Sequence, residues 1–123
     1  MEQEYIKGDI VMYDNKIHTI MDTLGVNNYE LSYVEHPVHQ LELSGVPVTP
    51  EILEKNGWEK DEEASFKTQL YYRKKSISKF IVIIIRKDTL RIVYNSECLN
   101  IIQYIHELQH LLFGLNLNHE IEV

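Results

Sequence analysis

The sequence predicts an α+β fold: a small curled antiparallel β unit, a short helix, a three-stranded antiparallel meander and a C-terminal helix packed on the sheet. Two apolar segments flank an Asp-Asn turn within residues 8–21, which is typical of a hairpin. Residues 80–85 form an unbroken apolar run, typical of a central strand, and residues 99–112 repeat apolar side chains at helical spacing. Together these segments indicate a mixed fold.

The first part of the chain predicts the curled β unit. Residues 8–13 and 17–21 are expected to pair around Asp14-Asn15-Lys16, because Asp and Asn tolerate turn geometry. Residues 29–34 alternate large apolar with polar side chains, which predicts a third strand with one exposed face. Residues 35–47 follow neither strand nor helix periodicity, so we expect a connector with a short extended piece.

A short helix is predicted after this connector. Thr49 is its expected N-cap, Pro50 occupies the first helical position and Glu51 suits the positive first turn. Asn56-Gly57 is the expected stop, and Trp58 is expected to close over the end of the helix.

Three strands and a second helix complete the prediction. Residues 64–94 alternate buried with exposed positions on either side of the apolar run 80–85, which should lie in the middle of the meander. The last helix is predicted over residues 99–112, with Gly114 as its stop. Residues 120–123 are expected to add an edge strand to the sheet.

Length and composition predict one soluble domain. The 123 residues suit a single core, with residues 1–45 as the β unit and residues 46–123 as the remainder. The net charge of −7 repels polyanions, so general DNA or RNA binding is not expected. No apolar stretch of about 20 residues is present, nor an N-terminal secretory signal, so we expect no membrane span and a cytoplasmic location.

One motif suggests metal chemistry. Residues 106–110 spell His-Glu-Leu-Gln-His, the H-E-x-x-H pattern of zinc peptidases. On a helix His106 and His110 would lie on one face and could bind zinc, and Glu107 could take a proton from the metal-bound water. The extended form of the motif requires a glycine where this chain has Phe113 and a histidine where it has Asn116, so it supplies no third ligand here.

Helical geometry favours a packing role for the same segment. Steps of about 100° per residue place Ile101, Ile105, Leu108, Leu112 and Leu115 in one apolar stripe. His110 falls nearly opposite this stripe, so we expect it to meet water or a partner chain. The leading prediction is therefore no catalytic residue, no metal and no cofactor, with a zinc hydrolase built on His106, Glu107 and His110 as the alternative.

Two segments resemble a group of short proteins from phages and prophages of gut anaerobes. These are residues 46–58, Val-Pro-Val-Thr-Pro-Glu-Ile-Leu-Glu-Lys-Asn-Gly-Trp, and residues 104–110, Tyr-Ile-His-Glu-Leu-Gln-His. In that group a P-L-T-x-E-x-L-x-K-x-G-F helix precedes a strand meander and a V-H-x-L-Q-x helix. The positions matching Glu107 and His110 are often Gln and Asn there, so the resemblance implies a packed or partner-facing helix.

The resemblance also implies a function in binding. Small acidic phage products that lack an active site commonly block a host protein or sequester nucleotide signals of antiviral defence. Nucleotide capture requires arginines for phosphate and aromatic rings for the base. The expected ligand residues are Tyr71, Arg73, Lys75, Arg91 and Trp58. The predicted function is thus a non-enzymatic, anti-defence binding protein, expected to be a homo-oligomer, with a purely structural homodimer as a further alternative.

Overall fold

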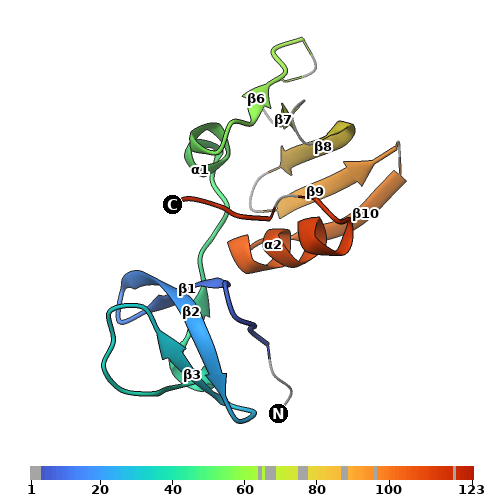
Figure 1. Ribbon diagram of the computed structural model, residues 1–123. Helices are drawn as coiled ribbons and strands as arrows, with labels where there is room; N and C mark the ends of the chain where they lie inside the picture. The colour runs from blue at the N-terminus through green and yellow to red at the C-terminus, as the bar shows by residue number, and fades with distance from the viewer. Residues whose placement is uncertain are drawn as a thin grey trace. The chain divides into compact units, whose positions relative to one another are not determined.

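The α+β class is confirmed by the computed structural model, which describes residues 4–63, 65, 69–74, 78–86, 89–95, 97–117 and 119–123 (Figure 1). The chain divides into two compact units. The first unit comprises Met1–Pro47 and Tyr104–Gln109, and the second unit comprises Val48–Gln103 and His110–Val123. Within the described residues, each unit contains one five-stranded antiparallel sheet.

The sheet of the first unit has the strand order β4-β3-β2-β1-β5. Its strands are β1 (Ile10–Tyr13), β2 (Lys16–Leu24), β3 (Asn28–Leu31), β4 (Val38–His39) and β5 (Ser44–Gly45). The predicted hairpin turn is confirmed, because Tyr13 pairs with Lys16 and the two residues between them have φ angles of 50° and 62°. Positive φ at both central positions matches the right-handed twist of the flanking strands.

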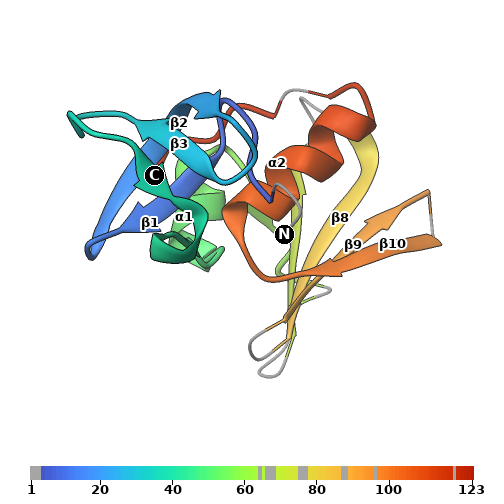
Figure 2. The same ribbon diagram turned by 90° about the horizontal axis from the view of Figure 1, so that it is seen from below.

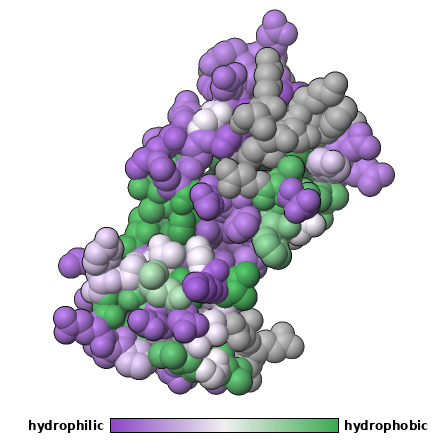
Figure 3. Space-filling model, in the orientation of Figure 1, coloured by the Kyte–Doolittle hydropathy of each residue, from purple (hydrophilic) through white to green (hydrophobic). Residues whose placement is uncertain are grey.

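The predicted connector contains more structure than its composition indicated. It holds β4, β5 and a short 3₁₀ turn, Gln40–Glu42, between them. His39 caps this turn, because its Nδ1 accepts a hydrogen bond from the N–H of Leu41 at 3.1 Å. The core of the unit consists of Tyr5, Val11, Ile20, Tyr29, Leu31, Val38 and Leu43. On the face shown in Figure 3, hydrophilic and hydrophobic residues are interspersed over this unit.

The second unit begins with α1 (Pro50–Lys55), which starts and stops as predicted. Thr49 Oγ1 accepts a hydrogen bond from the N–H of Ile52 at 3.2 Å, which satisfies one of the amides left open at a helix start. The sheet that follows has the order β10-β9-β8-β7-β6. Its strands are β6 (Glu59–Lys60), β7 (Leu70–Lys74), β8 (Ser78–Arg86), β9 (Thr89–Tyr94) and β10 (Glu97–Ile102), of which β8, β9 and β10 are seen side by side in Figures 1 and 2.

The predicted start of the last helix is wrong. Residues 99–102 belong to β10, and α2 spans Ile105–Gly114. Ile101 pairs with Arg91 and Ile102 with Leu90 on β9, so a ladder of backbone hydrogen bonds decides the conformation of a short apolar run that fits either period. The meander therefore has five strands in place of three, and Ile101 is 54% exposed.

The end of α2 also differs from the prediction. Gly114 is the last helical residue, but the residue with left-handed backbone is Asn116, with φ of 59°. The N–H of Leu117 donates to the carbonyl of Leu112 at 2.9 Å, and the N–H of Asn116 donates to that of Phe113 at 2.9 Å. This bonding pattern is a Schellman motif centred on Asn116. Residues 119–123 form no strand, contrary to the expected edge strand.

Across the described ranges, neither helix has the length and apolar character needed to cross a membrane.

Candidate functional site

The first histidine of the H-E-x-x-H segment packs among aromatic rings. His106 stacks on Tyr104, with ring centroids 5.8 Å apart and an interplanar angle of 10°. The Tyr5 ring packs against His106 in a T-shaped arrangement, with ring centroids 4.9 Å apart and an interplanar angle of 65°. All three residues belong to the first unit. The imidazole therefore serves as an aromatic surface against which the N-terminal segment packs.

The carboxylate of this segment caps its own helix. The N–H of Tyr104, the residue before α2, donates to Oε1 of Glu107 at 3.0 Å. A glutamate at the third helical position that accepts from the N-cap amide forms half of a capping box. Catalysis would require this carboxylate to face a metal-bound water instead.

The rest of the motif places two imidazoles one turn apart on α2. His110 is half-buried, and its expected contact with water or a partner chain stays a prediction. The predicted apolar stripe is confirmed for Ile105, Leu108 and Leu112, which are at most 2% exposed, and is wrong for Ile101. Within the described part of the chain, no group of three or more His, Cys, Asp or Glu side chains is arranged to hold a metal ion.

Three of the predicted ligand residues share one face of the second sheet. Tyr71 on β7 lies opposite Ile84 on β8, which lies opposite Arg91 on β9. Residues directly opposite on antiparallel strands project to the same side, and alternation along β7 adds Arg73 to that side. Arg91 is exposed, while Tyr71 and Arg73 are half-buried. We call the face that carries Tyr71, Arg73 and Arg91 the arginine face.

The opposite face of this sheet is the core side. Tyr72, Ile83 and Ile92, which are at most 2% exposed, project there. The two other predicted ligand residues do not join the arginine face. Trp58 is a core residue, 4% exposed, and its backbone N–H donates to the carbonyl of Leu53 at 2.9 Å. Lys75 lies outside the described residues.

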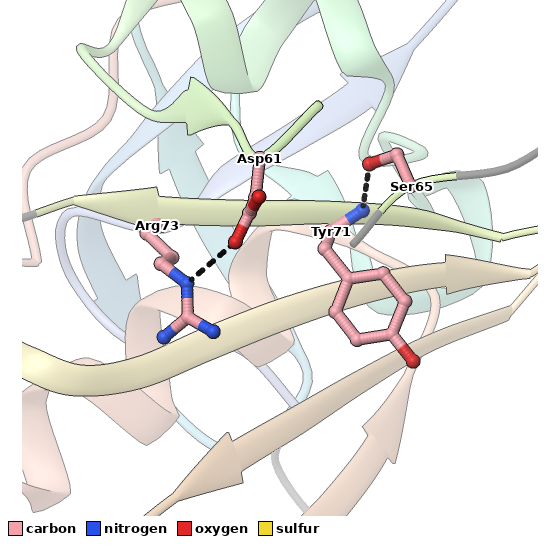
Figure 4. Close-up of polar contacts among 4 residues, drawn as sticks. All are labelled: Asp61, Ser65, Tyr71 and Arg73. Carbon is pink, nitrogen blue, oxygen red and sulfur yellow. Dashed lines mark hydrogen bonds and ion pairs between the residues drawn. The ribbon is translucent and has the colours of Figure 1, made fainter. Parts of the chain in front are cut away.

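An acidic partner that sequence reasoning missed orients Arg73. The Nε of Arg73 lies 3.2 Å from Oδ2 of Asp61, and Figure 4 shows the side chains of Tyr71 and Arg73 leaving β7 on the same side. The N–H of Asp61 donates to the carbonyl of Tyr71 at 2.8 Å, and the N–H of Tyr71 donates to Ser65 Oγ at 3.0 Å. The segment after β6 thereby fixes the position of β7.

Nothing in the sequence spacing indicates this contact. Asp61 is brought to Arg73 because β6 pairs with β7 in the register Glu59↔Arg73. The sequence suggests only a turn or edge role for an isolated aspartate. A visible signal is the charge distribution along the chain. Residues 67–94 contain eight Lys or Arg and one Asp, whereas residues 1–47 contain two Lys and eight Asp or Glu.

This charge distribution gives the strands of the second sheet a local excess of positive charge within a chain of net charge −7. The local electrostatic potential of these strands therefore differs from what the net charge alone indicates.

Comparison with protein-family models, with curated proteins and with solved structures finds no match to this chain. The resemblance to phage and prophage proteins stays a prediction.

Proposed function

We propose that this chain is a non-enzymatic, phage-type binding protein that sequesters a small phosphate-bearing nucleotide signal on the arginine face. The observation that carries the proposal is the strand register, which aligns Tyr71, Ile84 and Arg91 across three strands. An aromatic ring and a guanidinium on one face are the two groups that nucleotide capture requires, one for the base and one for the phosphate.

The ion pair with Asp61 supports this role for Arg73. Its Nε donates to Oδ2 of Asp61 at 3.2 Å, which favours one orientation of the guanidinium. A phosphate would then be bound through the Nη edge of the fork. A guanidinium that is already oriented loses less conformational entropy when it binds.

Capture without turnover is favoured by the roles of the H-E-x-x-H side chains. His106 packs against Tyr5 and Tyr104, and Glu107 caps α2. A protein that holds a nucleotide signal and leaves it intact would suit the anti-defence role implied by the resemblance to phage proteins.

The proposal is tested by ligand binding with recovery of the ligand. Cyclic dinucleotides and ADP-ribose derivatives are added to the purified chain, and the melting temperature and the binding isotherm are measured. We expect binding of at least one ligand, which is recovered chemically intact after denaturation. Hydrolysis of the ligand, or absence of binding across both classes, would contradict the proposal.

Matched variants place the site. Arg91→Ala should weaken binding by roughly tenfold or more, because a hydrogen bond to a charged group is lost. Tyr71→Ala should weaken it through lost stacking. Lys60→Ala is the control. Lys60 pairs with Tyr72 and so projects to the opposite face of the sheet, and the substitution removes one positive charge from that face. Equal losses in Arg91→Ala and Lys60→Ala would indicate a general charge effect and no site.

A second candidate function, the blocking of a host protein with a basic surface, is favoured by one specific contact. Asp22 on β2 lies directly opposite Glu30 on β3, and both are exposed. Like charges in this position destabilise a sheet, so their presence suggests a cationic partner. Charge reversal at Asp22 and Glu30 should abolish capture of such a protein at low salt, whereas Arg91→Ala should leave it unchanged.

A further inference from the structure

The C-terminal end of α1 holds a distant segment of the chain by its backbone. Asn56 Nδ2 donates to the carbonyl of Glu122 at 2.7 Å, and the N–H of Glu122 donates to Asn56 Oδ1 at 2.8 Å. Lys55 Nζ donates to the carbonyl of Val123 at 2.7 Å. Figure 1 shows residues 119–123 passing from the end of α2 to α1. α1, the C-terminal end of α2 and the held segment belong to the second unit.

The Asn56 carboxamide acts here as a substitute for a neighbouring strand. Its oxygen and nitrogen bond the N–H and the carbonyl of one and the same residue, as two paired residues do in an antiparallel ladder. Nδ2 also donates to the carbonyl of Ile52 at 2.7 Å, so the last turn of α1 fixes the amide before the segment arrives. Both bonds to residue 122 are made to its backbone N–H and carbonyl, so they do not depend on the side chain at that position.

A similar device in the first unit shows what differs at Asn56. The Oε1 of Gln109 accepts from the N–H of Ile10 at 3.1 Å, and its Nε2 donates to the carbonyl of Gly8 at 3.0 Å. Gln109 is only 6% exposed, so these bonds are sheltered from water. Glu122, by contrast, is exposed. Hydrogen bonds exposed to solvent open at low free-energy cost, so the segment at Asn56 is suited to exchange.

We propose that Lys55 and Asn56 form a docking site for an extended peptide segment, occupied by residues 122–123 of the same chain and open to exchange with the same segment of a second copy. The segment itself identifies the occupant, since the structure shows which backbone the site accepts. A tethered segment has an effective concentration on the order of millimolar, so the contact is intramolecular in dilute solution. Exchange between copies is then expected only at comparable protein concentration.

The site is tested by vacating it in the full chain. Glu122→Pro removes the N–H that donates to Asn56 Oδ1, whereas Glu122→Ala keeps it and is the matched control. The probe is a fluorescein-labelled peptide of sequence Leu-Asn-His-Glu-Ile-Glu-Val, which corresponds to residues 117–123. We expect the probe to bind Glu122→Pro at least tenfold more tightly than wild type, and Glu122→Ala to behave as wild type.

Variants of the site separate docking from non-specific association. Asn56→Ala in the Glu122→Pro background should abolish binding of the probe. Lys55→Ala should weaken binding of the probe severalfold. Because Lys55 is exposed, this variant should fold and can test the site even if Asn56→Ala impairs folding. Equal affinity of the probe for wild type and Glu122→Pro, or binding unaffected by either site variant, would overturn the proposal.

Exchange between copies has its own measurement. Analytical ultracentrifugation of wild type should show a dimer that appears as the protein concentration approaches about 1 mM and that Asn56→Ala removes. A chain that stays monomeric throughout this range would refute exchange with a second copy.

Discussion

Tyr5 and Tyr29 of the first unit pack together in the core, and Tyr29 is hydrogen-bonded to Gln40. The hydroxyl of Tyr29 donates to Gln40 Oε1 at 2.6 Å, and the N–H of Glu4 donates to the same oxygen at 3.0 Å. Tyr5 packs edge-on against Tyr29 at 5.7 Å. Burial, with a smaller contribution from the nearby Glu4 carboxylate, raises the pKa of Tyr5 from 10.0 to about 12, and burial also raises the pKa of Tyr29. The native state therefore favours neutral phenols at these positions.

This preference predicts a loss of stability at alkaline pH. Because the pKa of Tyr5 is about 12 in the folded chain and 10.0 when unfolded, the unfolded chain releases its proton first as pH rises. The free energy of unfolding should be insensitive to Tyr5 below pH 10 and fall by about 2–3 kcal/mol between pH 10 and pH 12.

Unfolding by guanidinium chloride at several pH values measures this change in the free energy of unfolding. Tyr5→Phe should lessen the alkaline loss, whereas Tyr33→Phe is the control, since Tyr33 is 100% exposed. A pH profile identical in wild type and Tyr5→Phe would show that Tyr5 does not titrate in this way.

Substitution of Glu107 distinguishes a capping role from a catalytic one. Glu107→Ala removes the acceptor for the Tyr104 N–H and should lower the free energy of unfolding by about 1 kcal/mol, while Glu107→Gln keeps an amide oxygen and should cost less. Urea unfolding followed by circular dichroism measures both. One zinc ion bound per chain, with a hydrolytic activity that Glu107→Gln abolishes, would instead support the zinc hydrolase.

At the scale of elements, a glycine sets the contact between β5 and the start of α2. Gly45 pairs with Val11, and a Cβ added to it would clash with the ring of Tyr104. The N–H of Ile105 donates to the carbonyl of Val46 at 2.8 Å, so the backbones are held close at this point. A Cβ at position 45 would therefore require the Tyr104 side chain or the backbone to shift.

Alanine substitutions at two glycines should therefore change the free energy of unfolding in opposite directions. Gly45→Ala should lower the free energy of unfolding by about 1–3 kcal/mol through overpacking. Gly114→Ala should raise it by about 0.5–1 kcal/mol, since Gly114 is helical and a Cβ there meets nothing within 4 Å. Thermal and urea unfolding of both variants provide the test, and a neutral Gly45→Ala would show that Tyr104 moves freely.

At the scale of the whole molecule, positive and negative charges are separated along the chain. Residues 67–94 contain eight Lys or Arg, although the net charge of the chain is −7. Attraction of an anionic ligand to the arginine face should thus depend on short-range charge, which salt screens.

If charge attracts the nucleotide to the arginine face, its binding affinity should fall as the salt concentration rises. Raising sodium chloride from about 50 mM to about 500 mM should weaken binding of a cyclic dinucleotide severalfold, because the Debye length shortens about threefold over this range. Isothermal titration calorimetry measures the slope, and Arg91→Ala should reduce it. Affinity independent of salt would mean that stacking and not charge holds the ligand.

Residues with strong local signals were assigned correctly from sequence. The Asp14-Asn15 turn, the Thr49 N-cap and the central strand of residues 80–85 each depend on neighbours a few positions away. Residues 99–102 were assigned wrongly, because a short apolar run fits a helix or a strand and the pairing with β9 decided between them. The site shows the same division: alternation along β7 placed Tyr71 with Arg73, but the partner Asp61 came from another strand.

The sequence by itself determined the α+β class, the polar and apolar faces of single strands and the charge of each segment, since these follow from the spacing and chemistry of nearby residues. Only the tertiary structure decided that Arg91 joins Tyr71, that Glu107 caps α2 and that Asn56 holds Glu122. The physical reason is that strand register and cap geometry arise from backbone hydrogen bonds and side-chain packing. The strand register and the Asn56 contact join positions far apart in the chain, and no local pattern encodes them. The Glu107 cap joins residues only three apart, but its N-cap is Tyr104 and not the Ser or Thr of a capping box, so the sequence does not signal it.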